Sequence, residues 1–411
     1  MTTGTQNTKW NIRASKASQR AVNPIRRIVD NLKVAPHPQK AVISLALGDP
    51  TIFGNFKIDE SCIDAVISKF RAHTSNGYGP STGLQVARDA IAQKYATKTS
   101  PLTPEDVIIA SGASGALELA IGAIADEGQN ILLPCPGFSV YETLAGPKKI
   151  QCRYYNLNPE RSWEIDIEHM KSLIDENTAA IIINNPSNPC GSVFSESHLK
   201  DILAVCDEYH LPLISDEIYG DMVFTGHKFT PIAALTDSVP VLTVGGLAKR
   251  YLVPGWRVGW VLIHDRNEIL SDVREGLVSL SQMIIGANTV IQAALPEILH
   301  KTPENFYDET NKQVEENALL CAELLSKIPG LQVVKPQGAM YMMVAIKPEE
   351  FKDIKDDVVF SEKLLGEESV IVLPAQCFKY PNYIRLVITP PKERLIEACE
   401  RIENFCRNHH V

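Results

Sequence analysis

TVGGLAKR, residues 243–250, is the stretch from which the organisation of this chain follows. An apolar run that begins at Val239 leads into it and is typical of a buried strand. Two glycines end the strand and place Lys249 on a tight turn, where backbone can come close to a ligand. In a chain without a metal-binding motif, a lysine at a strand end is a candidate for covalent chemistry with an aldehyde. The alternative at this point is an ordinary solvated lysine.

The composition limits the class of protein. Of the 411 residues, 45% are hydrophobic and 22% are charged, so the chain can bury the cores of two or three soluble domains. A net charge of −9 argues against a nucleic-acid partner. No apolar run approaches the roughly 20 residues that cross a bilayer, so we expect no membrane partner. Nine scattered cysteines without a Cys-x-x-Cys pair indicate reduced thiols in a reducing compartment such as the cytoplasm.

The N-terminal segment is basic. No acidic residue precedes Asp30, whereas six lysines and arginines do. This composition is typical of a mitochondrial transit peptide. The alternative is a flexible basic arm, residues 1–22, with order beginning near Asn23. Both interpretations stay open.

From residue 107 onward, apolar strands alternate with helical stretches. The strand at residues 107–110 ends in a glycine turn that opens a helix and consists of Ser111, Gly112, Ala113 and Ser114. Free N–H groups and the positive end of the helix dipole suit a phosphate, although a packed turn without a ligand fits equally well. Strands separated by helices of this length predict an α/β fold with a doubly wound, mostly parallel sheet.

Polar and aromatic side chains follow directly after other predicted strands. They are Phe138, Asn188, Asp216 and Tyr219. Because ligands bind at the carboxyl ends of parallel strands, we expect these side chains to face one crevice together with Lys249. Each has a simpler explanation alone, such as an aspartate that only caps a helix, but their common position favours a ligand site.

The C-terminal part changes to strands with helices packed against them, which predicts a smaller α+β domain beginning near residue 300. In the strand at residues 383–388, Arg385 alternates with apolar neighbours. A buried arginine requires an anion, which is either a ligand or a structural ion-pair partner. Tyr78 lies in a loop of turn formers, NGYGP, where its side chain is either exposed on the loop or packed against it.

These motifs resemble those of the fold-type I pyridoxal-phosphate-dependent aminotransferases. The matching stretches are NPCG at 188–191, DEIY at 216–219, GGLAK at 245–249, Arg257 and Arg385. Their order and spacing agree with the family from about residue 22 to 408. The resemblance implies a large domain at residues 76–300 with a mostly parallel sheet of seven strands. Residues 301–411 would form the C-terminal part of the small domain, and residues 23–75 would contribute to it and to a dimer interface.

The resemblance also implies a role for each matching residue. Lys249 would join the aldehyde of pyridoxal 5′-phosphate and move the substrate proton. Asp216 would pair with the ring nitrogen and keep it protonated. Asn188 and Tyr219 would hydrogen-bond the phenolic oxygen of the ring. Arg385 would bind the α-carboxylate of the substrate with its two-pronged guanidinium.

Further residues would hold the phosphate and line the substrate side. The phosphate would contact Arg257, the turn Ser111–Ser114, and Tyr78 of a neighbouring subunit. A homodimer is therefore the expected active unit. Phe138 would stack on the pyridine ring, and Gly48 would line the substrate side.

Two departures from the family pattern affect the expected specificity. Gly246 and Ala248 stand where related aspartate-type enzymes place hydroxyl residues, so phosphate binding depends more on Arg257 and backbone N–H groups. Those enzymes use an arginine near residues 281–285 for a side-chain carboxylate, and no arginine occurs there. An apolar wall in its place favours an aromatic amino donor. Arg26 is a candidate for the distal carboxylate of glutamate or 2-oxoglutarate.

The closest motifs are those of animal family members that act on tyrosine. The implied reaction transfers the amino group of L-tyrosine to 2-oxoglutarate, so the expected partners are small amino acids and 2-oxo acids. The alternatives are another donor such as kynurenine, a broad aromatic range, or β-elimination of cysteine conjugates. A cofactor-binding sensor without turnover is a further alternative, but the chain has no spare basic domain for DNA.

Overall fold

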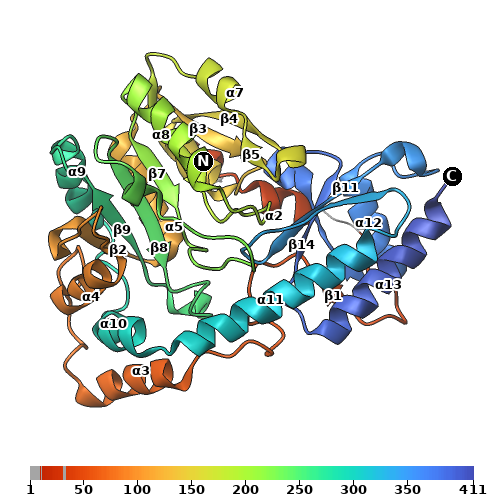
Figure 1. Cartoon of the computed structure of the whole chain (residues 1–411), viewed down its shortest axis with the longest axis horizontal. Coiled ribbons are helices and arrows are strands. Elements are labelled where there is room, and N and C mark those ends of the chain that lie inside the picture. Colours follow the sequence, from red (N-terminus) through yellow and green to blue (C-terminus); the bar gives the residue numbers. More distant parts are fainter. Residues whose placement is uncertain (1–9, 11, 31–33) are drawn as a thin grey trace, which may run out of the picture.

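The computed structural model describes residues 10, 12–30 and 34–411. These residues form a large sheet flanked by helices and a smaller sheet with its own helices, and the long helix α11 (Glu304–Leu325) runs beside both parts (Figure 1). In the described residues, no helix has the length and apolar character that crossing a membrane requires.

The large sheet has eight strands in the order β2-β9-β8-β7-β6-β3-β4-β5. They are β2 (Val107–Ala110), β3 (Asn130–Cys135), β4 (Gln151–Asn158), β5 (Glu164–Ile165), β6 (Thr178–Asn184), β7 (Leu213–Asp216), β8 (Val241–Gly246) and β9 (Gly259–His264). Neighbouring strands from β8 to β4 pair in parallel, whereas β9 and β5 run antiparallel to their neighbours. The predicted doubly wound, mostly parallel sheet is confirmed, but the expected number of seven strands is one too few. The additional strand β5 has only two residues, too few to show an alternating pattern.

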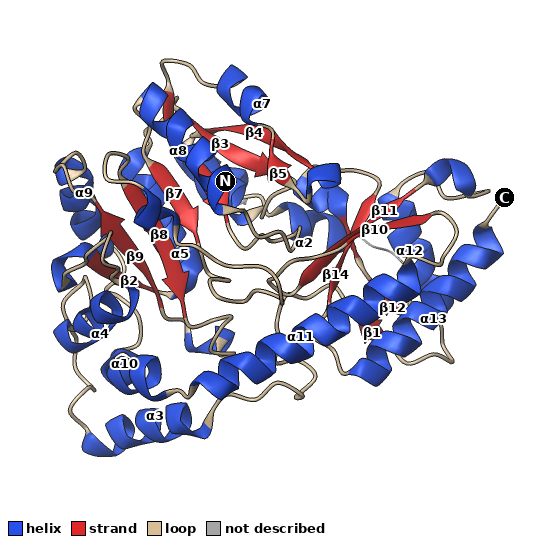
Figure 2. Cartoon of the chain, viewed as in Figure 1, coloured by secondary structure: helices blue, strands red, loops and turns tan. Residues whose placement is uncertain are grey.

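The strands of this sheet are apolar on both sides because helices cover both faces (Figure 2). Ile182 on β6 belongs to the cluster around α5 (Gly112–Ile124), whereas Ile181 and Ile183 belong to the cluster around α8 (Glu196–Tyr209). Successive side chains of a strand point to opposite faces, so both neighbours of a core residue must also be apolar. The other helices of the large part are α3 (Glu60–Ala72), α4 (Gln85–Tyr95), α6 (Val140–Ala145), α7 (Ile167–Ser172), α9 (Ser271–Ser281) and α10 (Thr289–Lys301).

The smaller part contains an antiparallel sheet in the order β10-β11-β14-β13. Its strands are β10 (Leu331–Val334), β11 (Tyr341–Ile346), β13 (Leu373–Pro374) and β14 (Tyr383–Val387). Two helices besides α11 pack here, α12 (Asp357–Glu368) and α13 (Lys392–His409). In α13 the buried residues Leu395, Ala398, Ile402 and Phe405 recur every three or four positions, which is the spacing of one helix face.

The N-terminal segment reaches both parts of the molecule. Its strand β1 (Ile43–Ser44) pairs in parallel with β12 (Val370–Ile371) of the smaller part. Its helices are α1 (Lys16–Arg20) and α2 (Pro24–Val29). The Arg20 guanidinium donates hydrogen bonds to the carbonyls of Gly146 and Pro147 in the large part. The predicted arm, residues 1–22, lies partly outside the described residues.

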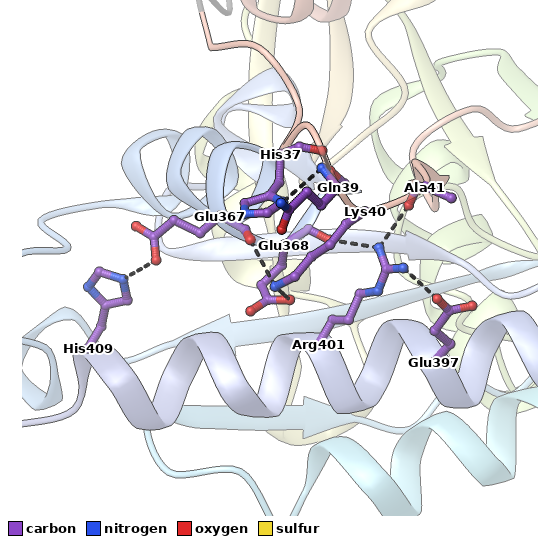
Figure 3. A network of polar contacts seen from close by, with 10 residues as sticks. His37, Gln39, Lys40, Ala41, Glu367, Glu368, Glu397, Arg401 and His409 are labelled. Atoms are coloured by element: carbon purple, nitrogen blue, oxygen red, sulfur yellow. Dashed lines mark hydrogen bonds and ion pairs between the residues drawn. The ribbon is translucent and has the colours of Figure 1, made fainter.

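A network of polar contacts fixes residues 37–41 and the end of α12 to α13 (Figure 3). Lys40 Nζ donates to a Glu368 carboxylate oxygen at 2.6 Å. His409, the last residue of α13, contacts Glu367 through Nε2 at 2.9 Å and Asp353 through Nδ1 at 2.6 Å. An imidazole with carboxylates at both nitrogens is best satisfied when it carries both protons.

We expect His409→Gln to lower the free energy of unfolding in a pH-dependent manner. Burial disfavours the charged imidazole, but hydrogen bonds to Glu367 and Asp353 outweigh this effect and raise the pKa of His409. Its contribution is therefore complete below the unfolded pKa near 6.5 and is lost as the pH rises through the raised folded pKa. Urea denaturation should show a loss on the order of 1 kcal/mol at pH 6 and almost none at pH 9. An equal loss at both pH values would contradict the role of the charge.

Candidate active site

The carboxylate of Asp216 lies at the end of β7 and is 2% exposed. The Tyr141 hydroxyl donates to Oδ2 at 2.8 Å, and the Ile218 backbone N–H donates to Oδ1 at 3.2 Å. Burial raises the pKa of Asp216 to about 6, while Tyr141, Ile218 and Lys249 act in the opposite direction. A buried carboxylate with neutral hydrogen-bond donors gains stability when a positively charged N–H group approaches it.

Lys249 follows β8, the parallel neighbour of β7, and the two strands lie side by side in Figure 2. Asp216 pairs with Val244 in the register, so the turn that carries Lys249 lies at the same sheet edge as Asp216. Lys249 Nζ donates to the Gly48 carbonyl at 2.5 Å and lies 5.9 Å from the centre of the Tyr219 ring. As predicted, the ends of β7 and β8 bring Asp216 and Lys249 to the same edge of the sheet.

Arg385 on β14 is a buried cation held by neutral acceptors. Nη1 donates to Asn188 Oδ1 at 2.8 Å, and Nη2 donates to the Ala46 carbonyl at 2.5 Å. Nε is buried without a hydrogen-bond partner among the described residues. Burial lowers the pKa of Arg385, and the groups that oppose this effect are two tyrosines and a cysteine rather than a carboxylate. This environment fits a carboxylate ligand, because a guanidinium remains charged and prefers a two-oxygen acceptor.

Two tyrosine hydroxyls meet beside Arg385. The Tyr219 and Tyr341 oxygens are 2.7 Å apart, and their rings pack edge to face. Burial raises the pKa of Tyr219 well above its ordinary value, so this phenol stays neutral. Tyr219 can therefore act as a hydrogen-bond donor to an anionic oxygen in the crevice.

The glycine turn before α5 forms a cradle with Arg257. Gly112 has φ of +72°, and an added Cβ would lie 2.6 Å from Arg257 Nη2, so only glycine fits. Arg257 donates to the carbonyls of Ser111 at 3.3 Å and Pro254 at 3.0 Å. No side-chain hydrogen bond caps the start of α5, so its first N–H groups are available. Helix N–H groups next to an exposed guanidinium suit a phosphate.

The comparisons with known proteins agree with this geometry. A family model described as aminotransferase class I and II matches residues 40–402. The chain belongs to this aminotransferase family. Tyrosine aminotransferase of Mus musculus is 52% identical over 403 residues, which cover 98% of this chain and 89% of that protein. Tyrosine aminotransferase of Dictyostelium discoideum is 49% identical over 408 residues, 98% of this chain and 97% of that protein.

Comparison with a solved structure supports the same family through the fold. The crystal structure of tyrosine aminotransferase from Leishmania infantum has a TM-score of 0.94 and 37% identity, covering 98% of this chain and 100% of that one. Enzymes of this family use pyridoxal 5′-phosphate. The buried acid Asp216, the lysine at the same edge and the cradle of Gly112 and Arg257 are groups of the kind that its ring nitrogen, aldehyde and phosphate require.

The remaining predicted site residues, Phe138, Gly48, Tyr78 and Arg26, have different surroundings. Phe138 packs edge-on against Tyr141, with 6.0 Å between ring centres. Gly48 has no room for a side chain, since a Cβ would lie 2.5 Å from the Tyr341 hydroxyl. Tyr78 is 95% exposed. Arg26 forms an ion pair with Asp30 at 3.8 Å, and no contact among the described residues joins it to Arg385.

Two residues of the aminotransferase site were not predicted, Tyr141 and Tyr341. Tyr141 follows Phe138 by three positions, on the turn that leads into α6, and the two rings are in contact. Tyr341 stands in an apolar strand, where an aromatic residue is ordinary. The position of Tyr141 close to Phe138 in the sequence could have indicated that it belongs to the site. The sequence around Tyr341 gives no such indication.

Proposed function

We propose that this aminotransferase moves the amino group of L-tyrosine to 2-oxoglutarate and forms 4-hydroxyphenylpyruvate and glutamate. One observation supports the proposal most strongly. Lys249, Asp216 and Arg385, a buried arginine without a carboxylate partner among the described residues, occur together in a chain 52% identical to a tyrosine aminotransferase. Such a reaction requires one group for the carboxylate, one for the amino nitrogen and one for proton transfer.

Bound pyridoxal 5′-phosphate supplies an aldehyde for the amino group and a ring that withdraws electrons from the substrate Cα. Asp216 would hold a proton on the ring nitrogen, because its buried carboxylate stabilises the cationic form. Lys249 Nζ, held beside Gly48, would remove the proton from the substrate Cα and deliver it to C4′, the former aldehyde carbon. Arg385 binds the α-carboxylate and fixes the orientation of the Cα–H bond, while Asn188 and Tyr219 donate to the phenolic oxygen.

The phosphate and ring contacts complete the proposed site. We assign the phosphate to Arg257 and to the N–H groups of residues 111–114 at the start of α5. Phe138, half-buried against Tyr141, is positioned to stack on the ring. Gly48 lines the substrate side, where any larger residue would displace Tyr341.

The preference for an aromatic donor rests on the segment SQMII at residues 281–285. Its side chains Met283, Ile284 and Ile285 are exposed and apolar, and the segment contains no arginine. An apolar surface binds an aromatic ring more favourably than a carboxylate, because a charged group loses its hydration there. Arg26, whose exposed side chain is only loosely paired with Asp30, is our candidate for the distal carboxylate of 2-oxoglutarate.

A donor panel tests the proposed reaction. Purified enzyme with pyridoxal 5′-phosphate and 2-oxoglutarate should give the highest kcat/KM with L-tyrosine, compared with phenylalanine, kynurenine, aspartate and a cysteine conjugate. The product should be 4-hydroxyphenylpyruvate with an equal amount of glutamate. A higher kcat/KM for kynurenine, or pyruvate and ammonia released from the conjugate at a higher rate, would contradict the proposal.

We propose a homodimer as the smallest active unit, because Tyr78 is 95% exposed on its loop and is assigned to the phosphate of a neighbouring subunit. Mixing Tyr78→Ala with Lys249→Ala subunits should restore about a quarter of wild-type activity, since half of randomly paired dimers then hold one intact site of two. Activity of the remixed sample, measured after denaturation and refolding together, checks this. A mixture no more active than the mean of the two separate variants would rule out the shared site.

We also propose a cytoplasmic location. All nine cysteines are free thiols, and seven of them are buried. This pattern suits a reducing compartment. Imaging of the full chain with a C-terminal fluorescent tag would distinguish it from the mitochondrial alternative.

A further inference from the structure

Tyr341 contacts three residues of the proposed site, namely Tyr219, Arg385 and Gly48. It lies on β11, is 1% exposed, and pairs in the register with Val387 of β14. Arg385 precedes Val387 by two positions and therefore lies on the same face of the sheet as Tyr341. Its guanidinium carbon lies 4.5 Å from the centre of the Tyr341 ring. The ring thus supports the cation that we assign to the substrate carboxylate.

The hydroxyl of Tyr341 reaches across to the large part of the molecule. It lies 2.7 Å from the hydroxyl of Tyr219, which follows β7, and either oxygen can be the donor. It also lies against the Gly48 backbone, whose carbonyl accepts from Lys249. One side chain of the smaller sheet therefore contacts residues assigned to the cofactor oxygen and to the substrate carboxylate.

The number of protons in the tyrosine pair decides whether Tyr219 can donate a hydrogen bond to a ligand. Two phenols hold two protons, and the hydrogen bond between them uses one. When Tyr341 donates, the proton of Tyr219 stays available for an anionic oxygen, and accepting a bond makes Tyr219 a stronger donor. When Tyr219 donates, it has no proton left for that oxygen.

We propose that Tyr341 is a positioning residue that directs the Tyr219 proton into the crevice and holds the plane of the Arg385 guanidinium. The hydroxyl and the ring perform separate tasks: the hydroxyl acts on Tyr219, and the ring face acts on Arg385. This inference rests on the proposed function, because it takes Tyr219 and Arg385 as ligands of cofactor and substrate.

Tyr341→Phe removes only the hydroxyl. Without the bond from Tyr341, Tyr219 is a weaker donor and stabilises the phenolate oxygen of the cofactor less. The cofactor therefore holds its titrating proton more tightly. The pKa of the visible absorbance of the holoenzyme should rise by about 0.5 to 1 pH unit. The Kd of 3-phenylpropionate, a carboxylate without an amino group, should stay within about twofold in calorimetry, since the ring beneath Arg385 is retained.

Tyr341→Leu removes the ring as well. The same titration should move, and the Kd of 3-phenylpropionate should rise by about 5- to 30-fold through loss of the cation–π contact. Tyr155→Phe is the matched control, because Tyr155 is also buried and donates a single bond, to the Ile182 carbonyl at 2.7 Å. It should change neither quantity.

Each result decides the proposal. An unchanged absorbance titration in Tyr341→Phe overturns the role of the hydroxyl, and an unchanged Kd in a folded Tyr341→Leu overturns the role of the ring. If the leucine variant does not fold, the phenylalanine variant still decides, because an unchanged titration alone refutes the proposal. A wild-type protein that shows no visible absorbance with pyridoxal 5′-phosphate refutes the proposed function instead, so the two failures are distinguishable.

Discussion

Lys249→Ala is expected to lower kcat/KM for L-tyrosine by at least about 10⁴-fold, since both covalent attachment of the cofactor and proton transfer at Cα are assigned to this amine. Lys249 Nζ lies beside the Gly48 carbonyl at the carboxyl edge of β8. We find no second lysine among the described contacts at this position that could replace it. The variant should also lose the visible absorbance of the bound cofactor and the half-reaction with L-tyrosine.

The matched control for this experiment is Lys327→Ala. Lys327 is an exposed lysine two residues beyond the end of α11, and among the described residues its ion pair is with Glu323 of that helix. Its removal should leave kcat/KM within about twofold, because exposed ion pairs contribute little. A Lys249→Ala enzyme that keeps even one-tenth of wild-type activity would refute the assignment of the amine.

Asp216→Asn is expected to lower kcat/KM by about 10³-fold while the protein keeps its fold. An amide has nearly the same shape and can still accept from Tyr141, but it cannot stabilise a positive ring nitrogen. The ring then withdraws fewer electrons from Cα, and loss of the proton becomes slow. Single-turnover rates with L-tyrosine measure this step directly, and an unchanged rate would contradict the role of the carboxylate.

The same substitution should change how the stability of the cofactor-free protein depends on pH. Burial raises the pKa of Asp216 from 3.8 to about 6. Its favourable contribution is complete below the unfolded pKa and is lost as the pH rises through about 6. Relative to wild type, Asp216→Asn should therefore gain on the order of 1.5 kcal/mol between pH 5 and pH 8. Urea denaturation at the two pH values checks this, and a constant difference would show that Asp216 is not destabilised by burial.

The large sheet and its ligand edge could be predicted from the sequence because their signals are local. Apolar runs that end in turn formers located β7 and β8, and the rule that parallel strands share a carboxyl edge brought Asp216 and Lys249 together. The sequence also predicts a helix at residues 311–328, whereas α11 begins at Glu304. Pro303 and Glu304 carry the signal of a helix start, so the earlier start could have been predicted.

The contacts of Tyr341 could not be predicted in the same way. The tyrosine pair joins residues 122 positions apart, and the position of Tyr341 in an apolar strand is explained equally well by ordinary packing. The hydrogen bond from Tyr141 to Asp216 likewise joins positions 75 apart. The tyrosine pair depends on how the two sheets lie relative to each other, and the Tyr141 bond depends on how α6 packs against the large sheet. One sequence contains neither piece of information.

We propose that one acid and one amine at adjacent strand ends, Asp216 and Lys249, bind the cofactor and carry out amino transfer from tyrosine. The most direct measurement adds L-tyrosine, without a 2-oxo acid, to the folded protein saturated with pyridoxal 5′-phosphate. We predict that the visible absorbance disappears and that one 4-hydroxyphenylpyruvate forms per chain. A protein that gains no visible absorbance with the cofactor, or that keeps it unchanged with L-tyrosine and forms no oxo acid, would contradict the account.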